Sequence, residues 1–348
     1  MIYSSLKTVE WKDNSVVMID QTKLPNELVY VTYTDYKDVA VAIRDLIVRG
    51  APAIGVSGAF GLALAALQST AKTKEELLAD LEKARMVLHE TRPTAINLAW
   101  GLQKIMDVAK SAKDVSEIKE SVVNEAKRMA QEDIEVNMRM GQIGSQLFDN
   151  NDTIMTHCNA GALATVGYGT ALGVIRATRD SGKKIKVIAT ETRPVMQGSR
   201  LTAFELQHDG IDVSLIPDTA VGYSMANKLV SKVIVGADRI LRTGHVYNKI
   251  GTYQVAMMAK QHGIPFYVAA PLSTFDLKSR PDEVVIEQRK ASEVTEVAGK
   301  KTAPDGINVI NPAFDMTPPE LITGIITEVG IAKPPFEESI RKLFESKL

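Results

Sequence analysis

Two residues of this chain have the types and settings that proton-transfer chemistry requires. Cys158, the only cysteine in 348 residues, stands in MTHCNAGALATVGYGTALG, where an apolar run gives way to glycines. Asp238 ends the apolar run VIVGAD, where an unpaired carboxylate is costly to bury. A thiolate accepts a proton, and a carboxyl in a dry site has a raised pKa and can donate one at neutral pH. The two residues are therefore candidates for a base and an acid.

Each of these residues also has a purely structural interpretation. A lone cysteine is most often a small buried hydrophobic residue. Asp238 could instead pair with Arg239 or cap the next turn. Spacing alone does not choose between these roles and catalysis.

The glycines after Cys158 could support anion binding. GALATVGYGTALG follows an expected strand and leads into a helical pattern, so its amides could face an anion at a helix N-terminus. The segment is not a Walker A sequence and lacks the full dinucleotide fingerprint. The glycines could equally serve only to let a helix and a sheet pack closely.

Four basic residues beside Gly, Pro or Asn are candidates for binding a phosphate: Arg49, Arg92, Arg193 and Lys249. A guanidinium binds phosphate oxygens in a bidentate manner, and a lysine adds a point charge. Metal ligation is not expected, because the five histidines lack HxxxH or HxH spacing and one cysteine cannot form CxxC. His157, next to Cys158, is expected to be structural.

Composition limits the classes of function. The chain is 45% hydrophobic and 24% charged, as in an ordinary globular protein. Lys and Arg number 41 against 42 for Asp and Glu, so no overall field favours nucleic acid or a membrane surface. The first residues lack a signal-peptide pattern, and no run approaches the roughly 18 apolar residues of a membrane span. We expect a cytoplasmic protein.

Cys158 and Asp238 each end an apolar run that we expect to be a strand of a sheet. Five such runs, separated by helix-length segments, span residues 153–158, 185–190, 212–216, 232–238 and 265–271. This rhythm predicts an α/β fold with a doubly wound parallel sheet and helices on both faces. Ligands bind beyond the carboxyl ends of such strands, where Cys158 and Asp238 stand.

The first third of the chain has a different pattern. Residues 15–20 and 28–33 have strand composition and are separated by a polar turn, which predicts a hairpin. Helical spacing begins at Tyr36 and continues to Phe148. We therefore expect a smaller, mostly helical N-terminal domain with a short β start over residues 1–125, and a Rossmann-like catalytic domain over residues 126–348.

A series of motifs carries a resemblance to a known family. In order, they include DQTKLP, VRGAPAIG, RPTAINLAW, THCNAGALATVGYGTALGVI, ETRPVMQGSRLTAFEL, VGADRI, NKIGTYQVAMMAK and ELITGIITEVGI. Together they resemble the methylthioribose-1-phosphate isomerases, from about Trp11 to Ile331. That fold is shared with the regulatory subunits of the exchange factor for translation initiation factor two.

The resemblance implies an activity and a set of site residues. It implies isomerisation of 5-methylthio-D-ribose 1-phosphate to the ribulose phosphate in methionine salvage, with Cys158 and Asp238 as the catalytic pair. It implies a homodimer. From the residue spacing and the charge balance we expect no metal or other cofactor and no nucleic-acid or membrane partner. The substrate-binding residues that the resemblance implies are Arg49, Gly50, Ala51, Arg92, Gln197, Asn248 and Lys249.

Two segments depart from the family pattern and leave other readings open. RTGHVYNKIGTY has bulky residues ahead of Asn248, among them Tyr247, and STFDLKSRPDEVVIEQR differs from the expected form. These departures concern the group on C5 of the sugar. The alternatives are 5-deoxyribose 1-phosphate, then ribose 1,5-bisphosphate, for which no second basic cluster is evident, and a non-catalytic regulatory subunit that only binds sugar phosphates.

Overall fold

The computed structural model describes residues 6–93 and 95–345. Thr94 of RPTAINLAW lies outside this range. The chain divides into two units, Met1–Met138 with Gly161–Leu172, and Arg139–Ala160 with Gly173–Leu348. The division expected between residues 125 and 126 falls inside helix α5 (Val115–Ser145).

Unit 1 begins with a small antiparallel sheet of β1 (Val9–Lys12), β2 (Ser15–Ile19) and β3 (Tyr30–Tyr33), paired in that order. The β2–β3 pair confirms the predicted hairpin. Strand β1 was not predicted, because VEWK is short and half charged and has no strand signal of its own.

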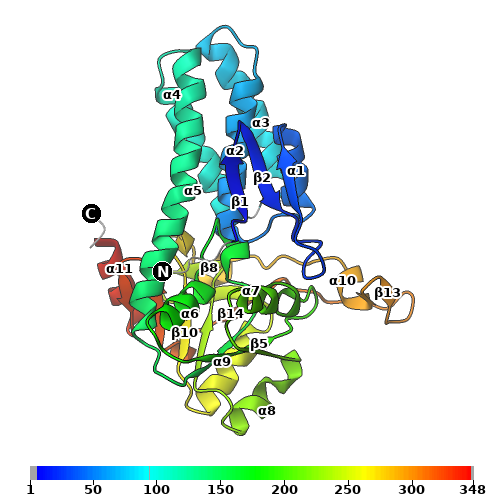
Figure 1. Ribbon diagram of the computed structural model, residues 1–348, viewed down its shortest axis with the longest axis vertical. Helices are drawn as coiled ribbons and strands as arrows, with labels where there is room; N and C mark the ends of the chain where they lie inside the picture. Colours follow the sequence, from blue (N-terminus) through cyan, green and yellow to red (C-terminus); the bar gives the residue numbers. More distant parts are fainter. Residues whose placement is uncertain (1–5, 94, 346–348) are drawn as a thin grey trace. The chain divides into compact units, whose positions relative to one another are not determined.

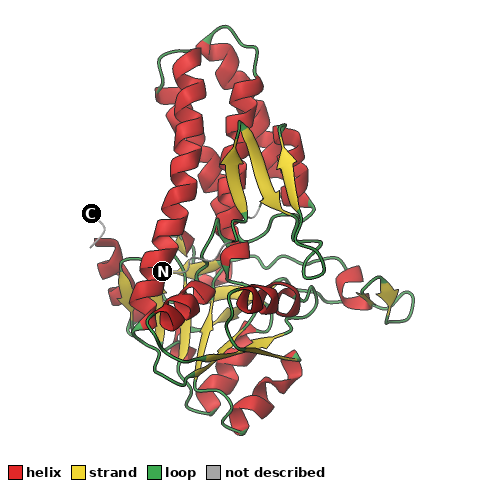
Figure 2. Ribbon diagram, viewed as in Figure 1, coloured by secondary structure: helices red, strands yellow, loops and turns green. Residues whose placement is uncertain are grey.

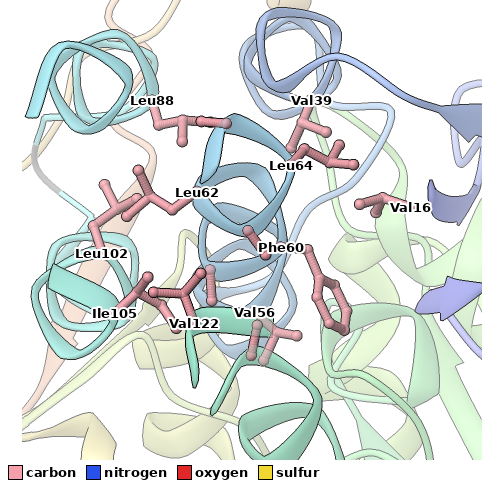
Figure 3. Packing of buried hydrophobic residues seen from close by; sticks show 14 of the residues in the cluster. Val16, Val39, Val56, Phe60, Leu62, Leu64, Leu88, Leu102, Ile105 and Val122 are labelled. Atoms are coloured by element: carbon pink, nitrogen blue, oxygen red, sulfur yellow. The ribbon is translucent and has the colours of Figure 1, made fainter. Parts of the chain in front are cut away.

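The helices of unit 1 pack around the central helix α2. They are α1 (Tyr36–Arg44), α2 (Ala51–Gln68), α3 (Lys74–Glu90), α4 (Ile96–Ser111) and α5. Apolar side chains such as Val39, Leu88 and Leu102 surround α2 (Figure 3). By length and composition α2 could cross a membrane, but 78% of its apolar window is buried. Its hydropathy is accounted for by packing on all sides.

Helices α2 and α4 cross with their backbones in close approach. A Cβ added at Gly101 would lie 2.5 Å from the carbonyl oxygen of Gly55, and one added at Gly55 would lie 2.8 Å from that of Asn97. Only glycine allows this approach. Because the crossing lies near the start of both helices, it places the segments that precede them at the same end of the pair.

Unit 2 is built on a seven-stranded sheet with the order β16-β15-β10-β7-β4-β5-β6. Its strands are β4 (Thr153–Thr156), β5 (Lys186–Thr190), β6 (Val213–Ile216), β7 (Lys232–Val235), β10 (Phe266–Ala269), β15 (Gly324–Thr327) and β16 (Gly330–Ala332). The five predicted strands are confirmed and are parallel. Strands β15 and β16 were not predicted, and β16 pairs antiparallel at the edge.

Helices cover both faces of this sheet. The first six strands in chain order lie as 3-2-1-4-5-6, the doubly wound order. Figures 1 and 2 show α6 and α7 on one side of the strands and α8 and α9 on the other. The helices of this part of the chain are α6 (Ala171–Asp180), α7 (Ala203–His208), α8 (Val221–Ala226), α9 (Thr252–Gln261), α10 (Ser292–Thr295) and α11 (Phe336–Glu345).

A second, four-stranded sheet was not expected. It has the order β11-β8-β9-β14, with β11 (Phe275–Asp276), β8 (Arg239–Leu241), β9 (Val246–Lys249) and β14 (Phe314–Thr317). A separate hairpin joins β12 (Glu296–Val297) and β13 (Lys300–Lys301). Short helical turns complete the chain: η1 (Ala162–Ala164), η2 (Gly198–Thr202), η3 (Asp218–Ala220), η4 (Leu272–Thr274), η5 (Pro281–Glu283) and η6 (Pro319–Leu321).

Candidate active site

The two catalytic candidates follow neighbouring strands at the point where the sheet reverses its order. Cys158 comes two residues after β4, and Asp238 comes three residues after β7. The two strands pair in parallel, with Met155 opposite Val233. This is the topological switch point of the sheet, where ligands of doubly wound folds bind. The topology thus brings Cys158 and Asp238 to the same edge of the sheet.

Cys158 is held in an unusual backbone conformation. It is 8% exposed and its φ is 64°, in the left-handed region that few residues other than glycine adopt. Its backbone N–H donates to Oγ1 of Thr192 at 2.9 Å, and its carbonyl oxygen accepts from the hydroxyl of Thr202 at 2.6 Å. Both polar groups of this peptide are therefore satisfied by side chains from other elements.

A buried ion cluster supports the residue after Cys158. The side-chain amide of Asn159 donates to Oε1 of Glu205 at 2.9 Å. The guanidinium of Arg176 lies 2.7 Å from Glu205 and 2.5 Å from Asp209, and Arg176 is 1% exposed. Breaking such a pair leaves an uncompensated buried charge, so this arrangement is rigid.

His157 has the structural role that the sequence predicted. Its Nε2 lies 2.8 Å from the carbonyl oxygen of Ile250, which can only accept, so Nε2 carries a proton. Burial lowers the pKa of His157. In the neutral ring Nδ1 accepts, and the hydroxyl of Thr190 donates to it at 2.7 Å.

Asp238 is joined to the smaller sheet beside Asn248. The backbone N–H of Asp238 donates to the carbonyl oxygen of Tyr247 at 2.9 Å, and Tyr247 is also the residue opposite Arg239 in the register of β8 and β9. Asp238 and Arg239 therefore both oppose Tyr247, as in a β-bulge, and Asn248 is the next residue of β9. In the register of β9 and β14, Asn248 pairs with Asp315, so the side chains of these two residues share a face of the sheet.

Asn248 and Lys249 point to opposite faces of β9, because side chains alternate along a strand. The amide of Asn248 donates to Oγ1 of Thr252 at 3.0 Å, at the start of α9. Nζ of Lys249 donates to the carbonyl oxygen of Ala313 at 3.0 Å and lies 4.9 Å from the centre of the Phe314 ring. Of the two, Asn248 lies on the face of the sheet that carries Asp315.

Asp315 fixes the turn that follows Lys249. Its carboxylate accepts from the backbone N–H groups of Gly251 at 2.7 Å and Tyr253 at 3.1 Å, which cap the N-terminus of α9. Burial raises the pKa of Asp315 to about 6. Asp315 could not be predicted from the sequence, because the capping contact spans more than sixty positions and leaves no local pattern.

Gln197 immediately precedes η2 and is buried. Residue type and spacing alone did not mark it as a site residue. Its Oε1 is buried and has no hydrogen-bond partner among the described residues. The next residue, Gly198, permits close packing, since a Cβ there would lie 1.7 Å from the carbonyl oxygen of Thr190. Buried polar atoms are usually hydrogen-bonded, so the amide oxygen of Gln197 is an exception among the described residues.

Arg193, a cationic candidate from the sequence, is engaged in structural contacts. Its guanidinium donates to the carbonyl oxygens of Pro194 at 2.9 Å and Val294 at 3.1 Å, and its backbone N–H donates to Asp218 at 2.6 Å. In residues 6–93 and 95–345 no cluster of three or more His, Cys, Asp or Glu has the arrangement of a metal site.

The remaining predicted binding residues lie in unit 1 at the start of α2 and before α4. Gly50 has a φ of 95°, and a Cβ there would lie 2.3 Å from the carbonyl oxygen of Ala164 in the glycine-rich segment. Ala51 is the first residue of α2, so Arg49 immediately precedes a helix N-terminus with its partial positive charge. The α2–α4 crossing places Arg92 at the same end.

Comparison with known proteins agrees with this architecture. The Initiation factor 2 subunit family model matches residues 47–334. The methylthioribose-1-phosphate isomerase of Thermosipho africanus is 54% identical over 339 residues, which cover 97% of this chain and 98% of that protein. The crystal structure of 5-methylthioribose 1-phosphate isomerase from Pyrococcus horikoshii OT3 is 46% identical, with a TM-score of 0.93 over 99% of this chain and 97% of that one.

A second solved structure carries a different name. The translation initiation factor eIF-2B, subunit delta, from A. fulgidus is 48% identical, with a TM-score of 0.90 over 98% of this chain and 100% of that one. The chain therefore belongs to the initiation factor 2 subunit family. Within that family it groups with the methylthioribose-1-phosphate isomerases and is an isomerase enzyme, as the motifs indicated.

Proposed function

We propose that this enzyme converts 5-methylthio-D-ribose 1-phosphate to 5-methylthio-D-ribulose 1-phosphate in methionine salvage. The observation that carries the proposal is the position of Cys158 and Asp238 after β4 and β7, the two strands that flank the switch point. The names of the full-length relatives support the substrate. A sugar phosphate is the small-molecule partner.

Asp238 is the general acid of the proposed reaction. The phosphate on O1 prevents the sugar ring from opening spontaneously to an aldehyde, so the enzyme must open it. Asp238 donates a proton to the ring oxygen while the bond from that oxygen to C1 breaks. Asn248 follows Tyr247, whose carbonyl oxygen accepts the Asp238 N–H, and we assign it to orient the carboxyl or the released hydroxyl.

The thiolate of Cys158 is the base, and two routes balance. If it takes the proton from C2, an enol phosphate forms, and protonation at C1 with loss of the C2 hydroxyl proton gives the ketone. If it takes the C2 hydroxyl proton, hydride moves from C2 to C1 and the ketone forms directly. The final ketose 1-phosphate is the same. In the first route Cys158 gives its proton to C1 and Asp238 recovers a proton from the C2 hydroxyl. In the second route the proton on Cys158 returns to Asp238 through solvent after the ketone forms.

The remaining binding residues are assigned by the same proposal. Guanidinium and ammonium groups hold the phosphate and backbone amides at a helix start add donors. The residues that we assign to substrate binding are Arg49, Gly50, Ala51, Arg92, Gln197, Asn248 and Lys249. We also propose that the enzyme is cytoplasmic and forms a homodimer. Size-exclusion chromatography with light scattering tests the dimer, which should have twice the 37.9 kDa mass of the chain.

The 5-deoxyribose 1-phosphate alternative is kept because the two departing segments meet in the structure. The hydroxyl of Tyr247 donates to the carbonyl oxygen of Pro281 at 3.1 Å, which joins one segment to the other. A pocket that merely lacks one apolar group discriminates by only about 1–3 kcal/mol. Both substrates therefore need to be compared directly.

The test is a steady-state assay of both substrates side by side, with the ketose 1-phosphate followed by phosphorus NMR. We expect kcat/KM for the methylthio substrate to exceed that for the deoxy substrate by at least tenfold, which is about 1.4 kcal/mol. The reverse ratio would mean a 5-deoxypentose enzyme. Binding of either sugar phosphate without turnover would support a regulatory subunit.

A further inference from the structure

The position of Cys158 after β4 does not by itself explain its backbone conformation. A cysteine with a φ of 64° has left the sheet and has turned its side chain in a direction that an extended residue would not reach. Such conformations persist only where surrounding contacts impose them, and they gather at functional sites.

Two threonine hydroxyls hold Cys158 in this backbone conformation. Thr192 follows β5 and accepts the N–H of Cys158 at 2.9 Å, while Thr202 ends η2 and donates to its carbonyl oxygen at 2.6 Å. Thr192 is fully buried and Thr202 is 1% exposed, so both contacts are shielded from bulk solvent. The two hydrogen bonds fix the peptide groups on either side of the Cys158 Cα.

Each threonine is held by further polar contacts, Thr192 by the half-buried Asp218 and Thr202 by Asn159. The backbone N–H of Thr192 donates to Asp218 at 2.8 Å, and Thr192 also has a positive φ, 64°. Oγ1 of Thr202 accepts from Asn159 at 3.2 Å, and Asn159 is tied to Glu205. The hydroxyls are therefore held in place before any substrate arrives.

We propose that Thr192 and Thr202 are positioning residues that set the direction of the Cys158 thiol. They act on the backbone of Cys158, not on the substrate. The inference rests on the proposed function, in which Cys158 is the base. It predicts that a threonine without its hydroxyl alters the behaviour of the thiol itself, an effect that a merely structural hydroxyl would not have.

The single cysteine makes the thiol directly observable. Thr192→Val and Thr202→Val remove a hydroxyl at nearly constant volume, while Thr192→Ser and Thr202→Ser keep it. The matched control is Thr178→Val, because Thr178 is fully buried in α6 and its hydroxyl donates to the Val174 carbonyl oxygen at 2.8 Å. For each variant, kcat and KM are measured with 5-methylthioribose 1-phosphate, and alkylation of Cys158 by iodoacetamide is followed by intact mass from pH 6 to pH 10.

The expected result separates the hydroxyls from general packing. Both valine variants lower kcat at least tenfold with KM within threefold, and change the alkylation rate at least threefold. Both serine variants stay within threefold of wild type, as does Thr178→Val. If a valine variant fails to fold, the alanine variant at the same position takes its place.

Two outcomes would overturn the inference: wild-type alkylation in the valine variants, or serine variants as impaired as the valine variants. A wild-type protein that turns over neither sugar phosphate would instead refute the proposed function. In that case the alkylation profiles still decide whether the two threonines control the thiol.

Discussion

The imidazole Nε2 of His157 lies 2.8 Å from the carbonyl oxygen of Ile250, which connects the end of β4 to the turn before α9. One neighbour of His157 is Cys158, and one neighbour of Ile250 is Lys249. A buried side chain thus links the segment of the proposed base to a segment of the proposed binding site. Gly251 is required there, because a Cβ on it would lie 2.9 Å from the imidazole.

His157→Asn is expected to change how stability depends on pH. Burial lowers the pKa of His157 in the folded state, so the unfolded chain binds the proton first. The free energy of unfolding of the wild type therefore falls as the pH drops below about 6.5, the ordinary histidine value. The variant loses this contribution to the slope, and it also leaves the Ile250 carbonyl unpaired, at a cost of about 1–3 kcal/mol at pH 7.5. Urea titrations at pH 5.5 and 7.5 measure both effects. An equal change in the free energy of unfolding between the two pH values in wild type and variant would contradict the account.

Asp133 in α5 is expected to have the opposite pH dependence. It accepts the backbone N–H of Val166 at 2.8 Å, and burial raises its pKa to about 7. The folded state therefore holds the proton more tightly than the unfolded chain, and stability falls as the pH rises from about 4 to about 7. Between pH 5 and pH 8 the wild type should lose about 2–3 kcal/mol more than Asp133→Asn. Parallel losses in the two proteins, measured by denaturant titration, would show that Asp133 does not titrate in this way.

Gly50→Ala is expected to be much more harmful than Gly182→Ala. Both glycines have positive φ, 95° and 87°, so both substitutions carry the left-handed penalty of about 1–2 kcal/mol. Only at Gly50 does the new Cβ meet backbone, since nothing lies within 4 Å of one added at Gly182. We expect Gly50→Ala to lower the Tm by about 5 °C more than the control, on the usual scale of a few degrees per kcal/mol. Calorimetry of the two variants makes the comparison, and equal shifts would be the contrary result.

Arg49→Lys and Arg92→Lys are expected to weaken substrate binding although the charge is kept. Lysine loses the planar fork that binds a phosphate in a bidentate manner. We expect KM to rise at least tenfold in each variant, or about 1.4 kcal/mol. Arg85→Lys is the control, because Arg85 pairs with Glu82 on α3 at 2.6 Å. An unchanged KM in both test variants would remove the two arginines from the proposed site.

The sequence was most informative where the signal is local. Apolar runs predicted the strands that β4, β5, β6, β7 and β10 form, and the residues that follow them predicted Cys158 and Asp238 at one sheet edge. Thr202 and Asp315 could not be predicted in the same way, because their partners are 44 and more than sixty positions away. The smaller sheet was missed for the same reason, since its strands are short and come from segments between residues 239 and 317.

The central claim is that Cys158 and Asp238 carry the chemistry, and turnover with binding measured alongside tests it most directly. Wild type, Cys158→Ser and Asp238→Asn are assayed on 5-methylthioribose 1-phosphate, while calorimetry gives the Kd of each protein for the same compound. We predict that each substitution lowers kcat by at least about 100-fold, the lower end of what general acid–base catalysis contributes, with Kd within about fivefold of wild type. A variant of either residue that retains wild-type kcat would contradict the claim.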